Sequence, residues 1–125
     1  MERLLVDSAI WIDHLRRPEP TLVRALRARR ALIHPFTIGE LALGNLRDRA
    51  AVLRELALRL RPRVAGDGEV LQMIEEHGLY GVGIGWVDAH LLASTLLTPE
   101  TQLWTRDKRL LAAAERLGVA AKPVN

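Results

Sequence analysis

The sequence contains no cysteine, few aromatic residues and no long uncharged stretch. Without cysteine, no disulfide or thiolate site can form, so any metal must be bound by carboxylates, histidines or carbonyl groups. No apolar stretch approaches the roughly 18 residues that a membrane-spanning helix needs. The first apolar stretch is interrupted by Asp7 and Asp13 and lacks the usual basic leader of a secretion signal. We therefore expect a cytoplasmic protein that is not associated with a membrane.

Length and charge narrow the class further. With 125 residues, 49% of them hydrophobic, we expect a single globular domain over residues 1–125. The net charge of +3 includes 16 arginines but only 2 lysines. Guanidinium groups bind phosphate through paired hydrogen bonds, although a GC-rich genome or a thermophilic host produces the same bias. A basic surface around an acidic pocket would attract a polyanion.

Short apolar stretches alternate with helical patterns along the whole chain. We expect strands at residues 4–6, 31–34, 102–105 and 119–121, and helices at residues 9–15, 21–29, 37–46, 49–60, 67–77, 86–97 and 108–117. Because the strands are continuously apolar, the pattern predicts an α/β fold whose mostly parallel sheet of four to five strands is covered by helices on both faces. Trp11, Trp86 and Trp104 are expected in the core.

Four acidic residues stand where an apolar stretch meets a helical pattern, namely Asp7, Glu40, Asp88 and Asp107. Glu40 and Asp88 have mostly apolar neighbours, and an isolated buried carboxylate is costly. Asp7 and Asp107 follow predicted strands, at the edge of a parallel sheet where ligands bind. If all four point into one crevice, they repel one another unless cations intervene. Carboxylates of this kind suit Mg²⁺ or Mn²⁺.

Each acid also has a purely structural explanation. Asp7 and Asp107 could cap the helices that follow them. Glu40 could complete a capping box with Thr37, and Asp88 could stabilise the first turn of its helix through the helix dipole. Capping accounts for each residue taken alone, whereas a shared site accounts for all four together.

Four segments, taken in order, resemble PIN domains, and most closely the VapC toxins of toxin–antitoxin pairs. These segments are LLVDS at residues 4–8, TIGEL at 37–41, GWVDAHLLA at 85–93 and LWTRDKRL at 103–110. The resemblance implies a three-layer α/β/α PIN-like domain and an endoribonuclease that depends on Mg²⁺ or Mn²⁺. By position, Asp7, Glu40 and Asp88 match the three acidic metal-site residues of the family, and Asp107 matches a fourth, more variable one.

The same resemblance implies further residues and partners. Ser8 and Thr105 match hydroxyl residues that support the site through phosphate or a ligand carboxylate, whereas His90 lies on the other side of its helix and is not expected as a ligand. A metal-activated water would hydrolyse the RNA phosphodiester and leave a 5′-phosphate and a 3′-hydroxyl. The expected partners are RNA, a cognate antitoxin that docks on residues 37–60, and a second copy in a homodimer.

Several arginines are candidates for an RNA path beside the acids, in particular Arg24, Arg27, Arg47 and Arg54. If they bind phosphates, neutralising them weakens RNA binding and flattens its salt dependence. A solvated helix face explains each of them equally well.

Two other function classes stay open at this point. One is another phosphate-handling enzyme, such as a phosphatase or a receiver domain, but those place paired acids after an early strand, and Asp7 is followed by Ser8-Ala9-Ile10. The other is a non-catalytic interaction module whose acids only cap helices. In that case, each substitution costs about 0.5–2 kcal/mol of stability and none affects metal binding.

Overall fold

The computed structural model describes residues 2–122. Its sheet has three parallel strands in the order β2-β1-β3, where β1 is Arg3–Val6, β2 is Ala31–Leu32 and β3 is Thr101–Trp104. In the register of this sheet, Leu5 of β1 lies beside Leu32 on one side and Leu103 on the other. These three leucines are at most 1% exposed, so the centre of the sheet is apolar throughout.

The expectation of four to five strands is wrong in number, because the outer two segments pair at single residues only. Leu60 forms a parallel bridge with Leu32, and Ala120 forms one with Leu103. The strand expected at residues 119–121 is therefore reduced to a bridge, and the one expected at 31–34 to β2. Ile33 donates its backbone N–H to Leu60 but has no strand partner on its other side, so regular pairing stops there.

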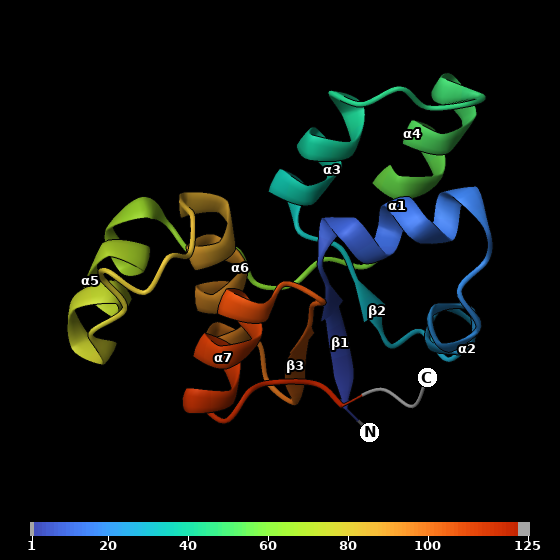
Figure 1. The fold of residues 1–125 in the computed structure, drawn as a ribbon. Helices are drawn as coiled ribbons and strands as arrows, with labels where there is room; N and C mark the ends of the chain where they lie inside the picture. The colour runs from blue at the N-terminus through green and yellow to red at the C-terminus, as the bar shows by residue number, and fades with distance from the viewer. Residues whose placement is uncertain (1, 123–125) are drawn as a thin grey trace.

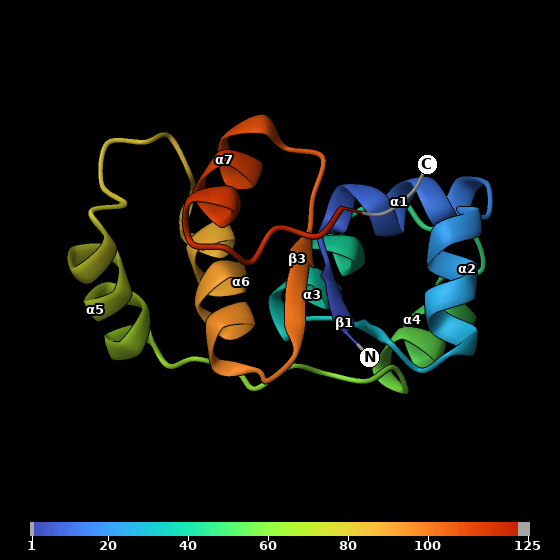
Figure 2. The same cartoon turned by 90° about the horizontal axis from the view of Figure 1, so that it is seen from below.

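Helices cover both faces of the sheet, as expected for a three-layer α/β/α PIN-like fold (Figure 1). They are α1 (Ser8–Arg16), α2 (Pro20–Arg27), α3 (Pro35–Ala42), α4 (Arg49–Ala57), α5 (Asp67–His77), α6 (Trp86–Leu97) and α7 (Lys108–Arg116). Figure 2 shows α5, α6 and α7 on one side of β3, with α1, α2 and α4 on the opposite side of the sheet.

Alternate residues of β1 serve two separate apolar cores. Leu5 packs into one core with Leu91 and Leu92 of α6. Leu4 and Val6 face the other core, which contains residues of α1, α2 and α3. This division follows from the period of two in a strand, which sends successive side chains to opposite faces.

Two local expectations are corrected by the helices. α3 begins at Pro35 rather than at Thr37, because His34 caps it and accepts the backbone N–H of Phe36 at 2.9 Å, and it ends at Ala42. Trp86, expected in the core, is 44% exposed at the first position of α6, whereas Trp11 and Trp104 are at most 3% exposed. Within residues 2–122, no helix is long and apolar enough to span a membrane.

Candidate active site

Asp7 lies at the carboxyl end of the central strand, where the chain turns directly from β1 into α1. It is 7% exposed, and its Oδ1 accepts the backbone N–H of Ser8 at 2.8 Å, which makes it the cap of α1. Its other oxygen, Oδ2, accepts the hydroxyl of Thr105 at 2.7 Å. Capping therefore occupies one oxygen of Asp7, and the second is fixed by a residue 98 positions away.

Asp107 is held close to Asp7 by the same threonine. Thr105 Oγ1 accepts the backbone N–H of Asp107 at 3.1 Å, so one hydroxyl connects the two acidic residues. Asp107 Oδ1 accepts the backbone N–H groups of Arg109 and Leu110, and it caps α7. Thr105 therefore lies between Asp7 and Asp107, and its supporting role in the site stays a prediction.

Asp88 lies in the first turn of α6, as the sequence suggested. Its Oδ2 reaches back to the backbone N–H of Gly85 at 3.4 Å, the residue before the helix. The side chain is half-buried rather than enclosed in apolar surroundings. A weak hydrogen bond of this length leaves most of the charge of Asp88 uncompensated.

Glu40 does not form the expected capping box. Because α3 starts at Pro35, Glu40 falls in its second half, far from the helix N-terminus. It is exposed, so the expectation that it is buried in apolar surroundings is wrong as well. Its carboxylate instead accepts a hydrogen bond from the side chain of Ser8, the residue after Asp7. No capping role accounts for Glu40 in this position.

The electrostatics connect all four acids. Although Glu40 as a residue is exposed, desolvation of its carboxyl group by neighbouring atoms raises its pKa most, the charges of Asp7 and Asp88 raise it further, and the hydrogen bond from Ser8 offsets part of the increase. Partial burial also raises the pKa of Asp88, the hydrogen bond from Gly85 opposes this, and the charges of Asp7 and Asp107 add to the increase. Acids from four separate helix regions therefore repel one another in a common field.

The donor chemistry of this cluster suits a hard divalent cation, because it offers carboxylate oxygens and excess negative charge. Within residues 2–122, however, no three or more His, Asp or Glu side chains stand close enough in their present rotamers to hold an ion. Asp7 and Asp107 are oriented by backbone N–H groups, while Glu40 is exposed and can change rotamer. The cluster therefore offers the donor atoms of a metal site, but in their present rotamers its side chains do not converge on one point.

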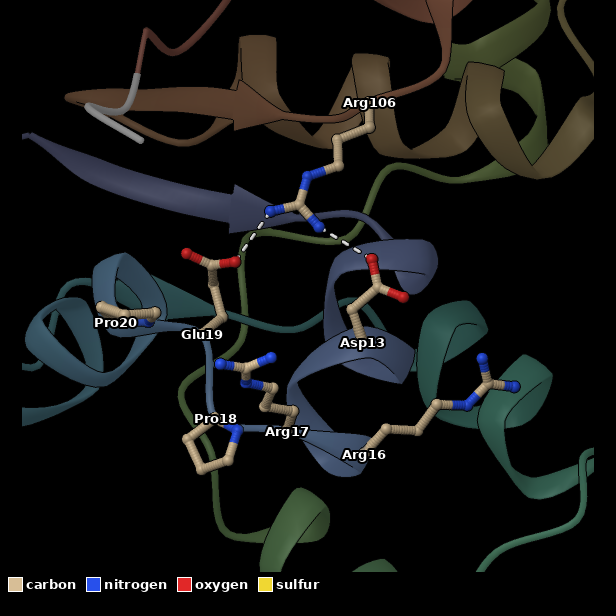
Figure 3. A pocket seen from close by; sticks show the side chains of 7 residues that line it. All are labelled: Asp13, Arg16, Arg17, Pro18, Glu19, Pro20 and Arg106. Carbon is tan, nitrogen blue, oxygen red and sulfur yellow. Dashed lines mark hydrogen bonds and ion pairs between the residues drawn. The ribbon is translucent and has the colours of Figure 1, made fainter.

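Next to the cluster, the side chain of Arg106 connects the segment at residues 105–107 to Asp13 and Glu19 (Figure 3). Its guanidinium lies 2.8 Å from Asp13 Oδ2 and 2.9 Å from Glu19 Oε2. The guanidinium carbon also lies 6.0 Å from the centre of the Trp104 ring. Arg106, Asp13 and Glu19 line a cavity of about 550 Å³ together with Arg16. Nothing in the sequence pattern marked Arg106 as part of the site.

The four arginines named as RNA contacts are not brought together. Arg24 and Arg27 lie on α2, which leads to the amino end of the sheet, where Arg30 O accepts the backbone N–H of Leu4. Arg47 instead lines a groove of about 550 Å³ with Glu40, and Arg16 lines the same groove. Arg54 is exposed on α4. Of these four, Arg47 is the one that shares a groove with an acid of the cluster.

Comparison with known proteins decides the family. The chain is 45% identical over 117 residues to Ribonuclease VapC32 of Mycobacterium tuberculosis, in strains CDC 1551 / Oshkosh and H37Rv, and the match covers 94% of both chains. The chain belongs to the VapC family of PIN-domain proteins. As a VapC-family member, it has relatives that are named as ribonucleases, which agrees with a hydrolase that acts on RNA.

The fold of this VapC-family chain also has a solved counterpart. The crystal structure of PAE2754 from Pyrobaculum aerophilum aligns with a TM-score of 0.58 at 22% identity, over 92% of this chain and 81% of that one. This similarity supports the fold of the VapC-family chain and says nothing of its substrate. No family profile among those compared matches the chain.

Proposed function

We propose that this protein is an Mg²⁺- or Mn²⁺-dependent endoribonuclease and the toxin of a cytoplasmic toxin–antitoxin pair. The observation that carries the proposal is the repulsive cluster of Asp7, Glu40, Asp88 and Asp107 at the carboxyl edge of the sheet. Mutual repulsion of acids in a ribonuclease family is explained most simply if a divalent cation compensates it during function. Helix capping explains three of these acids but leaves Glu40 without a role.

The four acids would hold the cation, which supplies an activated water and neutralises charge on the phosphate. Thr105 keeps Asp7 Oδ2 in one direction and spaces Asp107 from it by accepting its N–H. Ser8 donates to Glu40 and so restricts that exposed side chain. Arg106 holds the segment that carries Thr105 and Asp107 against α1. The protein thus orients the acids through hydroxyl and guanidinium contacts.

The groove at Glu40 is a candidate docking surface for the antitoxin. Its wall combines the apolar side chains of Ile12 and Leu15 with the cationic Arg16 and Arg47. A partner segment with apolar and acidic residues fits this combination, and it would cover Glu40 when bound. We therefore propose that the antitoxin docks on α1 as well as on residues 37–60. We also propose that the protein forms a homodimer, because the family resemblance described above implies one.

The test is RNA cleavage in Mn²⁺ with analysis of the product ends. We expect the wild-type protein to cut single-stranded RNA to fragments with a 5′-phosphate and a 3′-hydroxyl. Asp7→Asn and Glu40→Gln should each lower the rate at least 100-fold while the protein stays folded, because each removes one negatively charged ligand. Products with a 2′,3′-cyclic phosphate, or full activity in EDTA, would contradict the proposal.

A further inference from the structure

A cluster of aromatic rings lies between the first turns of α3 and α6. The ring of His90 lies 4.6 Å from that of Phe36 and 4.6 Å from that of Trp86, measured between centroids. His34 lies 5.0 Å from Phe36 on the inner side. His90 is 1% exposed, whereas Phe36 is 38% and Trp86 is 44% exposed. The two outer rings are therefore held in place by a buried ring and present part of their surface to solvent.

This cluster adjoins the acidic residues on two of their elements. Phe36 precedes Glu40 by four residues in α3, a spacing that places both side chains on the same face of the helix. Trp86 is the first residue of α6, two positions before Asp88, so the two side chains leave the first turn of the helix on different faces. A group that rested on the two rings would therefore lie about one helical turn from Glu40, on the side of the acidic residues that α3 provides.

Polar atoms inside the cluster have no hydrogen-bond partner among residues 2–122. They are His34 Nε2, Thr37 Oγ1 and the two ring nitrogens of His90, and these residues are at most 1% exposed. His90 Nε2 lies 3.3 Å from Asp67 Oδ1 without hydrogen-bond geometry. Buried polar atoms are normally paired, so this unpaired set is an unusual feature of the interior beneath the two rings.

We propose that Phe36 and Trp86 form a stacking platform for one nucleobase of single-stranded RNA, beside the phosphate that the acids would engage. The inference rests on the proposed function, and it assigns a role to two residues outside the acidic cluster. Bases stack on aromatic side chains irrespective of sequence. The nearby negative charge of Asp67 disfavours a phosphate at the platform but tolerates a neutral base.

The exposed area argues for a base rather than for a second copy of the chain. Two rings that are 38% and 44% exposed offer on the order of 200 Å² of surface. A stable dimer buries about 800 Å² on each partner. A single stacked base matches the size of this platform, whereas a dimer would need much more surface around it.

Fluorescence provides a selective assay, because Trp86 is the one exposed tryptophan and Trp11 and Trp104 are buried. The Asp7→Asn variant is titrated with a single-stranded RNA hexamer of mixed sequence in Mg²⁺, so that the RNA stays intact. We expect RNA to quench the emission. Affinity is measured in parallel by the anisotropy of a 5′-fluorescein-labelled hexamer, which does not depend on Trp86. Trp86→Ala should weaken binding roughly 5- to 150-fold, as should Phe36→Ala. Trp86→Phe should abolish the quenching but keep the affinity within about threefold, since it retains an aromatic face.

The matched control is Leu71→Ala, which removes an apolar side chain of similar exposure from α5 and should leave RNA affinity unchanged. RNA affinity that stays within twofold in both Trp86→Ala and Phe36→Ala would overturn the platform. A change from dimer to monomer in these variants by light scattering would overturn it in favour of a second copy. Wild-type protein that binds RNA through Trp86 but does not cleave it would support the platform and refute the nuclease.

Discussion

The hydroxyl of Thr105 offers a sensitive test of how the site is built. Thr105→Val keeps the shape of the side chain but removes the hydrogen bond to Asp7 Oδ2 and the acceptor for the N–H of Asp107. Thr105 and Asp7 are 6% and 7% exposed, so water does not readily replace the lost donor. Asp107 is exposed, so its N–H can bond to water instead. The main loss is therefore the bond to the buried carboxylate.

A hydrogen bond to a charged group contributes about 1.5–3 kcal/mol. We expect Thr105→Val to lower the free energy of unfolding by about 2–3 kcal/mol, or Tm by roughly 8–12 °C for a chain of this size. RNA cleavage should fall as well, because Asp7 loses the contact that fixes its second oxygen. Urea denaturation in EDTA measures the stability without any contribution from bound metal.

Thr105→Ser is the control, because it keeps the hydroxyl and removes one methyl group. It should lose no more than about 1 kcal/mol of stability and retain most of the activity. If Thr105→Val instead unfolds within 0.5 kcal/mol of the wild type, the hydroxyl does not hold Asp7, and the reasoning about the site is wrong.

Three further predictions concern charge. Burial and the nearby His90 lower the pKa of His34 to about 4. Because the unfolded chain binds the proton first, the free energy of unfolding should fall by on the order of 3 kcal/mol as pH decreases from about 6.5 to 4. His34→Asn, which can still cap α3, should flatten this slope in urea titrations at several pH values. Because desolvation of its carboxyl group and repulsion by Asp7 and Asp88 raise the pKa of Glu40, its charge destabilises the metal-free protein above that pKa. Glu40→Gln should therefore raise the stability in EDTA at neutral pH by a few tenths to about 1 kcal/mol, whereas Glu55→Gln on α4 should not. Arg106→Gln should lower the stability by about 0.5–1.5 kcal/mol, and a double-mutant cycle with Asp13→Asn should give a coupling of about 0.2–1 kcal/mol; zero coupling would show that the ion pair does not hold the segment at residues 105–107.

The sequence was sufficient to predict the alternating α/β order and several element boundaries. α5 and α6 begin and end where their apolar pattern and flanking glycines predict. The outer strands were overestimated, because an apolar segment of three residues satisfies strand propensity without finding a full partner. Leu60 pairs with Leu32, and Ala120 pairs with Leu103. These pairings depend on where the chain returns to the sheet, which the local sequence does not encode.

The location of the acids agrees only in part with the sequence prediction, and their role as metal ligands stays a prediction. Asp7, Asp88 and Asp107 lie at helix starts as expected, whereas Glu40 lies in the second half of α3 because His34 and Pro35 start that helix earlier than Thr37. An imidazole nitrogen as helix cap is not among the common capping patterns. Arg106 and the ring cluster at His90 were missed because their partners are distant in the chain.

The central claim is that the four acids form one metal site, and Mn²⁺ binding by calorimetry tests it most directly because no substrate is required. The wild-type protein should bind Mn²⁺, and Asp7→Asn and Asp88→Asn should each lose this binding while their circular dichroism stays native. Glu55→Gln should bind as the wild type does. Absence of Mn²⁺ binding in the wild type at millimolar metal, or unchanged binding in both variants, would contradict the account and leave Asp7, Asp88 and Asp107 as helix caps.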